Sequence, residues 1–486
     1  MSQDATAGLE AIPDPAIAPV PQRLVLVLPS SGEFDSRTYR IATTAVARGH
    51  QVTVLARWRA GLPLEEVHPA GYRIVRVAAS SIDGLPFPTF RGWLGRRLRA
   101  RPGRATRTGP GREVALSAPA VAERTSVEQA AAAAIDETDP AAAVTVAASS
   151  RRASPPRRMF ASVVRRLAIP LTIRSHRRAA EAIAPAADLY HGMAYMGIPV
   201  ALALGQRHRA AVVYDARDIY LEARNLARMR GPARWLLATA ERRWAHRSSR
   251  VVTVNRAYAE VLEERLHVTL PLIVMNCSYR YKPPDPPIRR FHDRLGLAPD
   301  RPVVLYHGGL FPNRGIEELI SAMSLLSDAV LVLMGYGVLE AELPARIAMS
   351  PAADRIHVLP AVPPQDLHDW VAAADVAVMP IQPSTLNHRL TTPNKLFEAM
   401  AAGVPVVASD LPGMASIVTA TGCGVLCDPI DPASIAGAIR RILDAPEPER
   451  RAIAARGRSA ANETYNWETQ ATILFGEYGR LTGQPW

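Results

Sequence analysis

Lysine is almost absent from this chain of 486 residues. Of its 57 lysine and arginine residues, only Lys282 and Lys395 are lysines. Because arginine has replaced lysine at nearly every other cationic position, these two positions are informative. A lysine ammonium is a compact point charge that suits a phosphate, whereas a guanidinium is a planar fork. Lys395 therefore marks a candidate phosphate site. The alternative is a solvated lysine in the first turn of a helix.

Cysteine is also scarce. The chain contains Cys277, Cys423 and Cys427. A small, odd number argues against a disulfide framework and is typical of a reducing compartment. Cys423 and Cys427 lie four residues apart, but no histidine or further cysteine nearby completes a zinc site. We interpret Cys423 and Cys427 as small core residues and expect no bound metal.

Long apolar runs are missing, so no segment is predicted to span a bilayer. Residues 1–21 are acidic and rich in proline and alanine, and they lack the basic and apolar regions of a signal peptide. We expect them to form a disordered lead-in to a cytoplasmic protein. The first strand–helix loop has no GxGxxG pattern, so the sequence does not predict NAD or FAD there.

The positive charge is concentrated in one region. Residues 91–178 hold 18 arginines and six acidic residues, which accounts for the whole formal net charge of +12. Such a segment favours lipid head groups or nucleic acid, or is a solvated tail. Residues 91–156 show no periodic apolar face, so we expect a largely disordered basic insertion. Residues 157–178 suit a basic amphipathic helix broken near Pro170. This helix either lies on an anionic membrane or packs on its own domain, and we favour packing.

Strands and helices alternate through the rest of the chain, which predicts α/β domains with doubly wound parallel sheets. In such sheets ligands bind at the carboxyl ends of the strands. The polar or flexible residues expected there in the first half are Ser31, Gly32, His191, Asp215, Arg217 and Asp218. For His191, and for the set of Asp215, Arg217 and Asp218, a capping or ion-pair role is equally compatible with the sequence.

The second half repeats the pattern after a proline-rich linker that begins at Lys282. A strand that starts near Val303 leads into a loop with Gly308, Gly309 and Arg314. Glycines between a strand and a helix let backbone N–H groups approach a phosphate, and an arginine adds charge. The spacing differs from that of a Walker loop, so an ATPase is not indicated.

The segment 387–410 contains the second phosphate signal. Thr391 and Thr392 are predicted to cap a helix, with Pro393 in its first turn. The helix is expected over 394–402 and ends at Gly403, which suits a left-handed position. A buried strand is predicted from 404 to 408. The helix start, its dipole and Lys395 together favour an anion.

Four stretches in order resemble retaining nucleotide-sugar glycosyltransferases of family 4 (glycosyl transferases group 1). They read HGGLFPNRGIEELI, VLMGYG, DLHDWVAAADVAVMP and NKLFEAMAAGVPVVASD. The resemblance implies a GT-B fold, with two Rossmann-like domains facing a central cleft. The implied regions are an acceptor-side domain at 22–282, a linker at 283–300, a donor domain at 301–465 and a last helix at 466–486 that packs back on the first domain.

The family also implies roles for individual residues. It would assign Arg314 to the donor diphosphate, Glu398 to the ribose hydroxyls and the segment from Thr391 to Lys395 to the sugar and diphosphate. Further donor contacts are implied at Gly308, Gly309, Gly335, Tyr336, Val362, Thr392, Pro393 and Asn394. Its first domain would place Ser31, Gly32, His191, Asp215, Arg217 and Asp218 toward sugar and acceptor. We interpret Arg314, Lys395, His191 and Asp215 as catalytic.

Three positions depart from the family pattern. Gly309 stands where an arginine is usual, Leu390 where the first glutamate of the donor loop is usual, and Arg217 where a histidine is common. These departures leave open which side chain holds the hydroxyls of the sugar. Lys395 is a candidate for the charge that Gly309 does not supply.

The resemblance predicts an enzyme that transfers a sugar from a nucleotide-diphosphate sugar to a hydroxyl of a glycan, lipid-linked or small-molecule acceptor, with retention. No metal or other cofactor and no nucleic-acid partner are expected. Cell-envelope or exopolysaccharide synthesis, and a place in the cytoplasm or on the inner face of the plasma membrane, follow as expectations. The alternatives are another GT-B enzyme, such as a sugar-nucleotide epimerase or a phosphorylase, and a non-catalytic sugar-nucleotide-binding subunit.

Overall fold

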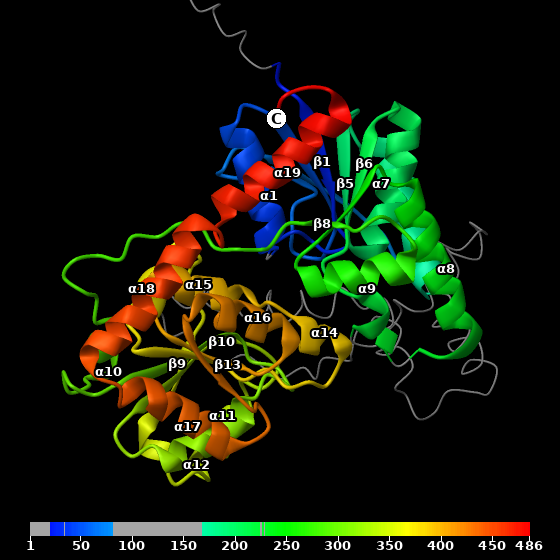
Figure 1. Cartoon of the computed structure of the whole chain (residues 1–486). Helices are drawn as coiled ribbons and strands as arrows, with labels where there is room; N and C mark the ends of the chain where they lie inside the picture. Colours follow the sequence, from blue (N-terminus) through cyan, green and yellow to red (C-terminus); the bar gives the residue numbers. More distant parts are fainter. Residues whose placement is uncertain (1–19, 34, 81–167, 224–225, 228) are drawn as a thin grey trace, which may run out of the picture.

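The computed structural model describes residues 20–33, 35–80, 168–223, 226–227 and 229–486. The predicted lead-in, the basic insertion at 91–156 and the part of the basic helix before residue 168 lie almost wholly outside these ranges. Two sheets divide the described chain into two α/β domains, as Figure 1 shows. This confirms the predicted fold class of paired, doubly wound parallel sheets.

The first sheet has eight strands in the order β3-β4-β2-β1-β5-β6-β7-β8. Every pairing is parallel except that of β3 with β4, an edge strand that the sequence did not predict. Apolar runs such as RLVLV form strands buried on both faces because helices cover both sides of the sheet. The strands are β1 (Arg23–Val27), β2 (Gln51–Arg57), β3 (Glu65–Val67), β4 (Arg73–Val77), β5 (Leu189–Met193), β6 (Ala211–Asp215), β7 (Arg250–Thr253) and β8 (Leu272–Ile273).

The helices of the first domain alternate with these strands along the chain, as in a doubly wound sheet. They are α1 (Ser36–Ala47), α6 (Ala168–Ile183), α7 (Ala194–His208), α8 (Gly231–Arg247) and α9 (Arg256–Leu266). The predicted break near Pro170 does not occur in the described part of α6, which contains Pro170 and continues to Ile183. No loop separates β5 from α7, although one was predicted, because Ala194 turns the chain directly with φ 60°.

The second sheet has six parallel strands in the order β11-β10-β9-β12-β13-β14. They are β9 (Val303–Gly309), β10 (Val330–Tyr336), β11 (Ile356–Pro360), β12 (Val376–Met379), β13 (Val406–Ser409) and β14 (Gly424–Cys427). The strand predicted at 404–408 therefore begins two residues later. Its helices are α10 (Arg290–Leu295), α11 (Ile316–Ala322), α12 (Leu343–Ala348), α13 (Leu367–Val371), α14 (Leu386–Leu390), α15 (Asn394–Ala402), α16 (Pro412–Thr421), α17 (Pro432–Leu443) and α18 (Glu447–Glu463).

In each sheet the first strand of the domain lies at the point where the strand order reverses. β1 pairs with β2 on one side and β5 on the other. β9 likewise lies between β10 and β12. Ligands of open α/β sheets bind beyond the carboxyl ends of strands at such a switch point. The loops after β1 and β9 are therefore the places where the fold itself favours a ligand.

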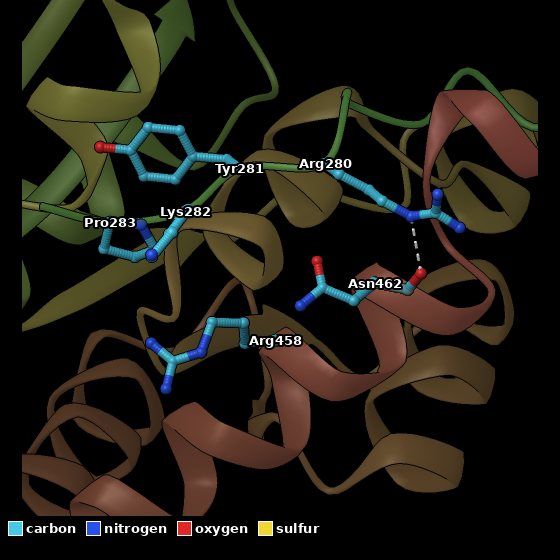
Figure 2. A pocket seen from close by; sticks show the side chains of 6 residues that line it. All are labelled: Arg280, Tyr281, Lys282, Pro283, Arg458 and Asn462. Carbon is cyan, nitrogen blue, oxygen red and sulfur yellow. Dashed lines mark hydrogen bonds between the residues drawn. The ribbon is translucent and has the colours of Figure 1, made fainter.

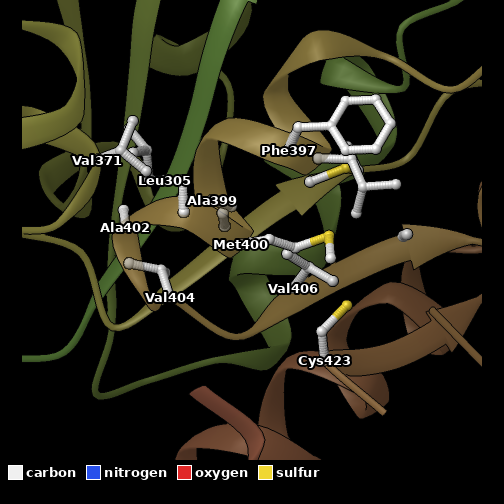
Figure 3. Close-up of a cluster of buried hydrophobic side chains, with 14 of the residues drawn as sticks. Leu305, Val371, Phe397, Ala399, Met400, Ala402, Val404, Val406 and Cys423 are labelled. Atoms are coloured by element: carbon white, nitrogen blue, oxygen red, sulfur yellow. The ribbon is translucent and has the colours of Figure 1, made fainter. Parts of the chain in front are cut away.

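The helix α15 is anchored in the core of the second domain. Its residues from Lys395 to Ala402 are all buried, and Figure 3 shows Phe397, Ala399 and Met400 within the apolar cluster. Gly403 ends the helix with φ 71°, as predicted. The predicted threonine cap is wrong, because Pro393 is the N-cap and no side chain caps the helix. The N–H groups of its first turn thus lack a side-chain partner.

The last helix, α19 (Trp467–Thr482), returns to the first domain, and Figure 1 shows it (red) beside α1. Its buried side chains include Trp467, Leu474 and Tyr478. The indole Nε1–H of Trp467 donates to Thr44 Oγ1 at 2.8 Å. Ile473 was expected on the apolar face but is 39% exposed, because it lies on the outer side of the helix.

Candidate functional site

The glycine loop after β9 brings the backbone of the second domain against Lys395. Gly308 has φ +104°, and a Cβ added there would lie 3.6 Å from Lys395 Cε. Gly315, with φ +72°, begins α11 so close to β12 that its Cβ would lie 2.0 Å from the Pro380 oxygen. A residue with a side chain would push the loop outward at Gly315. The glycines thus hold the loop beside the start of α15.

Lys395 is a buried lysine that forms no ion pair in the described chain, although the negative charge of Glu398 on the same helix acts on it. Its side chain is 9% exposed, and its Nζ lies 3.6 Å from the centroid of the Tyr306 ring. Within the described part of the chain, Nζ makes no hydrogen bond. Burial, and then the charge of Arg314, lower the pKa of the Lys395 ammonium well below its ordinary value. The ring face provides a cation–π contact but no charge.

Arg314 supplies a second free cation. It lies in the loop between β9 and α11, is half-buried and forms no ion pair with any residue of the described ranges. Burial is the main cause of the pKa shifts of Lys395, Tyr306 and His388, and the charge of Arg314 also acts on each of them, so all three groups lie near it. Two cations that repel one another at the carboxyl edge of a sheet are stabilised by a bound anion.

Glu398 lies one helical turn beyond Lys395. Its Oε2 accepts a hydrogen bond from His307 Nε2 at 3.0 Å. Burial raises the pKa of this carboxyl, but the His307 hydrogen bond and the positive charge of Arg40 outweigh it, so the pKa lies below its ordinary value. Glu398 is therefore an ionised, oriented acceptor. Arg40 belongs to α1, so the first domain contributes charge to this carboxylate.

Further predicted donor residues lie at the same edge of the second sheet. β9 and β10 place Gly309 opposite Tyr336 and Gly308 opposite Gly335. A Cβ at Gly335 would lie 1.9 Å from the Gly308 oxygen, so these strand ends are in close contact. Val362 follows the neighbouring parallel strand β11 and is half-buried against the apolar core.

Side chains of the donor loop, which we define as residues 387–394, contact the first domain. Thr392 Oγ1 accepts a hydrogen bond from Asn255 Nδ2 at 3.2 Å. Asn394 Oδ1 accepts one from Asn276 Nδ2 at 3.0 Å. Thr391 is the C-cap of α14 and Pro393 the N-cap of α15, so both shape the loop through the backbone. Thr392 and Asn394 therefore join domains in this structure.

His191 and Asp215 form a buried network. Asp215 Oδ2 lies 2.6 Å from Arg37 Nε and accepts from His191 Nε2 at 3.1 Å. His191 Nδ1 lies 2.6 Å from the Tyr478 hydroxyl. Both His191 and Asp215 are 0% exposed. Neither can touch a substrate in this arrangement, so their predicted catalytic roles are replaced by a role in holding α1, β5, β6 and α19 together.

The protonation of this network follows from its geometry. Burial raises the pKa of Asp215, but the charge of Arg37 and the hydrogen bond from His191 outweigh burial and keep it below its ordinary value. Burial lowers the pKa of His191, which favours the neutral ring. Since ionised Asp215 only accepts, His191 carries its proton on Nε2 and accepts from the Tyr478 hydroxyl at Nδ1.

The acceptor-side predictions have mixed outcomes. Ser31 is buried, and its hydroxyl donates to Glu33 Oε2 at 3.0 Å. Gly32 has φ +86° in the loop after β1, which a residue with a side chain rarely adopts. Arg217 donates to both carboxylate oxygens of Asp35, at 2.8 and 2.6 Å. Asp218 is exposed. Of the four, only Asp218 presents its side chain openly to solvent.

Two pockets in the described part of the chain lie elsewhere. One pocket, of about 590 Å³, lies between residues 280–283 and helix α18. Figure 2 shows Arg280, Lys282 and Arg458 around it. Another of about 980 Å³ lies among α6, α7 and α8. No predicted donor residue lines either pocket. In the described ranges no group of three or more His, Cys, Asp or Glu residues could hold a metal ion.

The sequence did not identify several residues that surround the site. Tyr306 and His307 precede the predicted glycines within the same HGG stretch, so a closer interpretation of that stretch could have found them. Arg40 and Asn255 gave no signal, because their proximity to the donor loop depends on how the domains meet.

The sequence of the second domain is similar to that of known proteins. Residues 301–445 match the family model described as Glycosyl transferases group 1. A D-inositol 3-phosphate glycosyltransferase of Xylanimonas cellulosilytica is 31% identical over 225 residues, which cover 45% of this chain and 52% of that protein. The chain thus spans about half the length of the curated relatives it matches.

Solved structures resemble nearly the whole chain. Sucrose-phosphate synthase from Thermosynechococcus elongatus superimposes with a TM-score of 0.65 and 17% identity, over 95% of this chain and 99% of that one. Anabaena Alr3699/HepE in complex with UDP-glucose does so with a TM-score of 0.56 and 16% identity, over 95% and 100%. The two-domain architecture is the GT-B fold that the sequence predicted.

A test of the site follows from the unpaired Lys395. Replacing a buried, unpaired charge by an apolar side chain of similar length removes a desolvation penalty. We expect Lys395→Met to raise the melting temperature of the empty protein by a few degrees, equivalent to about 1 kcal/mol. Lys282→Met, which removes the exposed lysine, is the matched control and should change nothing. A clear loss of stability in Lys395→Met would show that the ammonium has a stabilising partner.

Proposed function

We propose that the chain is a retaining glycosyltransferase of family 4 that moves a sugar from a nucleotide-diphosphate sugar to a hydroxyl acceptor. One observation carries the proposal. Lys395 and Arg314 are neighbouring basic residues that form no ion pair in the described chain, at the carboxyl edge of a sheet and the start of α15. A diphosphate supplies the missing charge. The UDP-glucose bound in the structural neighbour Alr3699/HepE supports a nucleotide-sugar donor.

In the proposed mechanism these cations stabilise the departing diphosphate. Negative charge develops on the phosphate oxygens as the sugar leaves, and preorganised cations and dipoles there lower the barrier. Lys395 is held on the Tyr306 ring, and the uncapped first turn of α15 adds its N–H groups and dipole. Because neither group must move to meet the charge, little reorganisation is needed.

The acceptor proton passes to the leaving phosphate in this proposal. A pair of catalytic carboxylates, as in glycosidases, is then not required. This suits a site in which Asp215 and His191 are buried in an internal network. Retention of configuration rests on this step and is part of the proposal.

Glu398 is the proposed ribose ligand. His307 occupies Oε2 of the carboxylate, and no described hydrogen bond uses Oε1. An ionised carboxylate with one oxygen held in place and the other available can accept hydrogen bonds from sugar hydroxyls. Gly335 and Tyr336, at the end of the neighbouring strand, are the proposed contacts of the nucleoside.

The acceptor belongs to the proposal at the level of its class. We place it among hydroxyls of glycans, lipid-linked sugars or small polar molecules of the cell envelope or exopolysaccharides. Curated relatives include transferases whose names specify inositol phosphate and 2-deoxystreptamine acceptors. Both are polyhydroxylated, which agrees with a hydroxyl acceptor.

Donor binding tests the proposal directly. A ligand that binds the folded state raises the melting temperature, so a panel of UDP-, GDP- and ADP-sugars should contain at least one that stabilises the protein. We expect Arg314→Ala and Lys395→Met each to weaken its binding tenfold or more, about 1.4 kcal/mol, and to abolish most transfer. Lys282→Met should bind normally. The site assignment fails if both site variants bind and transfer like the unaltered protein.

α6 packs on α7 and β4 of its own domain, as favoured from the sequence, and we also propose that its exposed face binds anionic membranes. Among the described helices, none has both the length and the apolar character needed to cross a bilayer. α6 exposes Arg174, Arg177 and Arg178 beside the pocket of about 980 Å³, whose wall is largely apolar. Basic residues next to apolar side chains favour an anionic lipid surface.

Vesicle binding tests this localisation. In Arg174→Gln/Arg178→Gln we expect binding to vesicles rich in phosphatidylglycerol to fall tenfold or more, since each arginine contributes about 1 kcal/mol. The control Arg294→Gln/Arg441→Gln removes two exposed arginines from the second domain. Equal binding by both double variants would exclude α6 as the membrane surface.

A further inference from the structure

A side chain of the second domain forms a two-point contact with the backbone of the first. Asn387 belongs to α14 and is the first residue of the donor loop, residues 387–394. Its Oδ1 accepts from the Ile219 N–H at 2.9 Å, and its Nδ2 donates to the Ile219 oxygen at 3.3 Å. Asn387 is 6% exposed. The amide thus satisfies both backbone groups of one residue, as a neighbouring strand would.

A second amide reaches back from the first domain. Asn255 is the N-cap of α9, and its Oδ1 accepts from the Tyr258 N–H at 2.8 Å. Its Nδ2 donates to the Leu390 oxygen at 2.8 Å and to Thr392 Oγ1 at 3.2 Å. One side chain therefore caps a helix of the first domain and holds the donor loop of the second.

Two more contacts complete the interface. The Tyr258 hydroxyl donates to the backbone carbonyl oxygen of Asn387 at 3.0 Å, and Tyr258 is 2% exposed. At the other end of the loop, Asn276 Nδ2 donates to Asn394 Oδ1 at 3.0 Å and to Ser36 Oγ at 3.1 Å. The loop is held at both ends by groups from outside its own sheet.

These contacts exist only while the domains are at this separation. Buried amides and carbonyls without partners are costly, so the groups must be either joined across the interface or hydrated. None of the contacts uses Arg314, Lys395 or Glu398. Their effect on chemistry is therefore on where the donor loop lies relative to the first domain.

We propose that Asn387 and Asn255 are positioning residues that fix the donor loop, residues 387–394, to the first domain for the transfer step. This rests on the proposed function and on the acceptor-side role that the family resemblance implies for the first domain. The two amides hold the acceptor domain at reaction distance from the diphosphate site. They act on transfer to the acceptor and leave donor affinity to the cations of the second domain.

The first test is Asn387→Leu, which keeps the volume and removes both hydrogen bonds to Ile219. We expect the donor dissociation constant to change less than threefold, and kcat for transfer to fall tenfold or more. The ratio of donor hydrolysis to transfer should rise, because water reaches the donor when the acceptor is misplaced. The control is Asn462→Leu on α18, an exposed asparagine whose side-chain amide makes no hydrogen bond in the described structure.

Asn255→Asp is a second variant, which keeps the shape of the side chain. Aspartate is as good an N-cap as asparagine, so α9 should keep its start. Its carboxylate cannot donate to the Leu390 oxygen and repels it. We expect the same loss of kcat as in Asn387→Leu and a larger radius of gyration of the empty protein in small-angle X-ray scattering. The scattering readout does not depend on activity.

The outcomes separate this inference from the proposed function. If no nucleotide-sugar binds or is transferred by the unaltered protein, the proposed function fails and scattering alone decides the role of the amides. If transfer occurs but both variants match Asn462→Leu in kcat and in radius of gyration, the inference is overturned. It is also overturned if donor affinity falls as much as kcat, because the amides would then serve donor binding.

Discussion

The site depends on a buried lysine whose Nζ has no hydrogen bond or ion pair in the described chain. Lys395 rests on the face of Tyr306, beside the repelling charge of Arg314, with no hydrogen-bond acceptor in the described chain. Such an arrangement is unfavourable in the empty protein, since a buried unpaired charge is costly. It becomes favourable when a dianionic or trianionic ligand enters. The protein thus carries an electrostatic strain at the place where its fold favours a ligand, and the diphosphate of the proposed donor would relieve it.

The rest of the second domain holds this ammonium in place. α15 is buried along its length, so the Lys395 backbone cannot shift without disturbing the core. The left-handed Gly308 lets the strand end pass within contact distance of the lysine side chain, and Gly315 lets α11 begin against β12. The first domain adds Arg40 toward Glu398 and amides toward the donor loop. Both domains therefore shape one site, although the free cations belong to the second.

The sequence predicted the architecture well because alternating apolar strands and amphipathic helices are local patterns. It also indicated Arg314, Lys395 and Glu398, since glycine loops and helix starts have local signatures. It failed for His191 and Asp215, whose burial depends on α19, more than 250 residues later in the chain. It failed for the cap of α15, because two threonines next to a proline resemble a cap wherever they occur. Arg40, Asn255 and Asn387 could not be predicted, since only the meeting of the two domains gives them their partners.

Proton linkage tests the central claim most directly. The pKa of Lys395 is depressed in the empty protein by burial and by Arg314, and a bound diphosphate should raise it. Calorimetric titration of UDP, or of the preferred nucleoside diphosphate, at a series of pH values in buffers of different ionisation enthalpy measures the protons exchanged on binding. The account predicts proton uptake by the unaltered protein and none by Lys395→Met. Binding without proton uptake, or equal uptake by the variant, would contradict the assignment of Lys395 as the unpaired cation that receives the diphosphate.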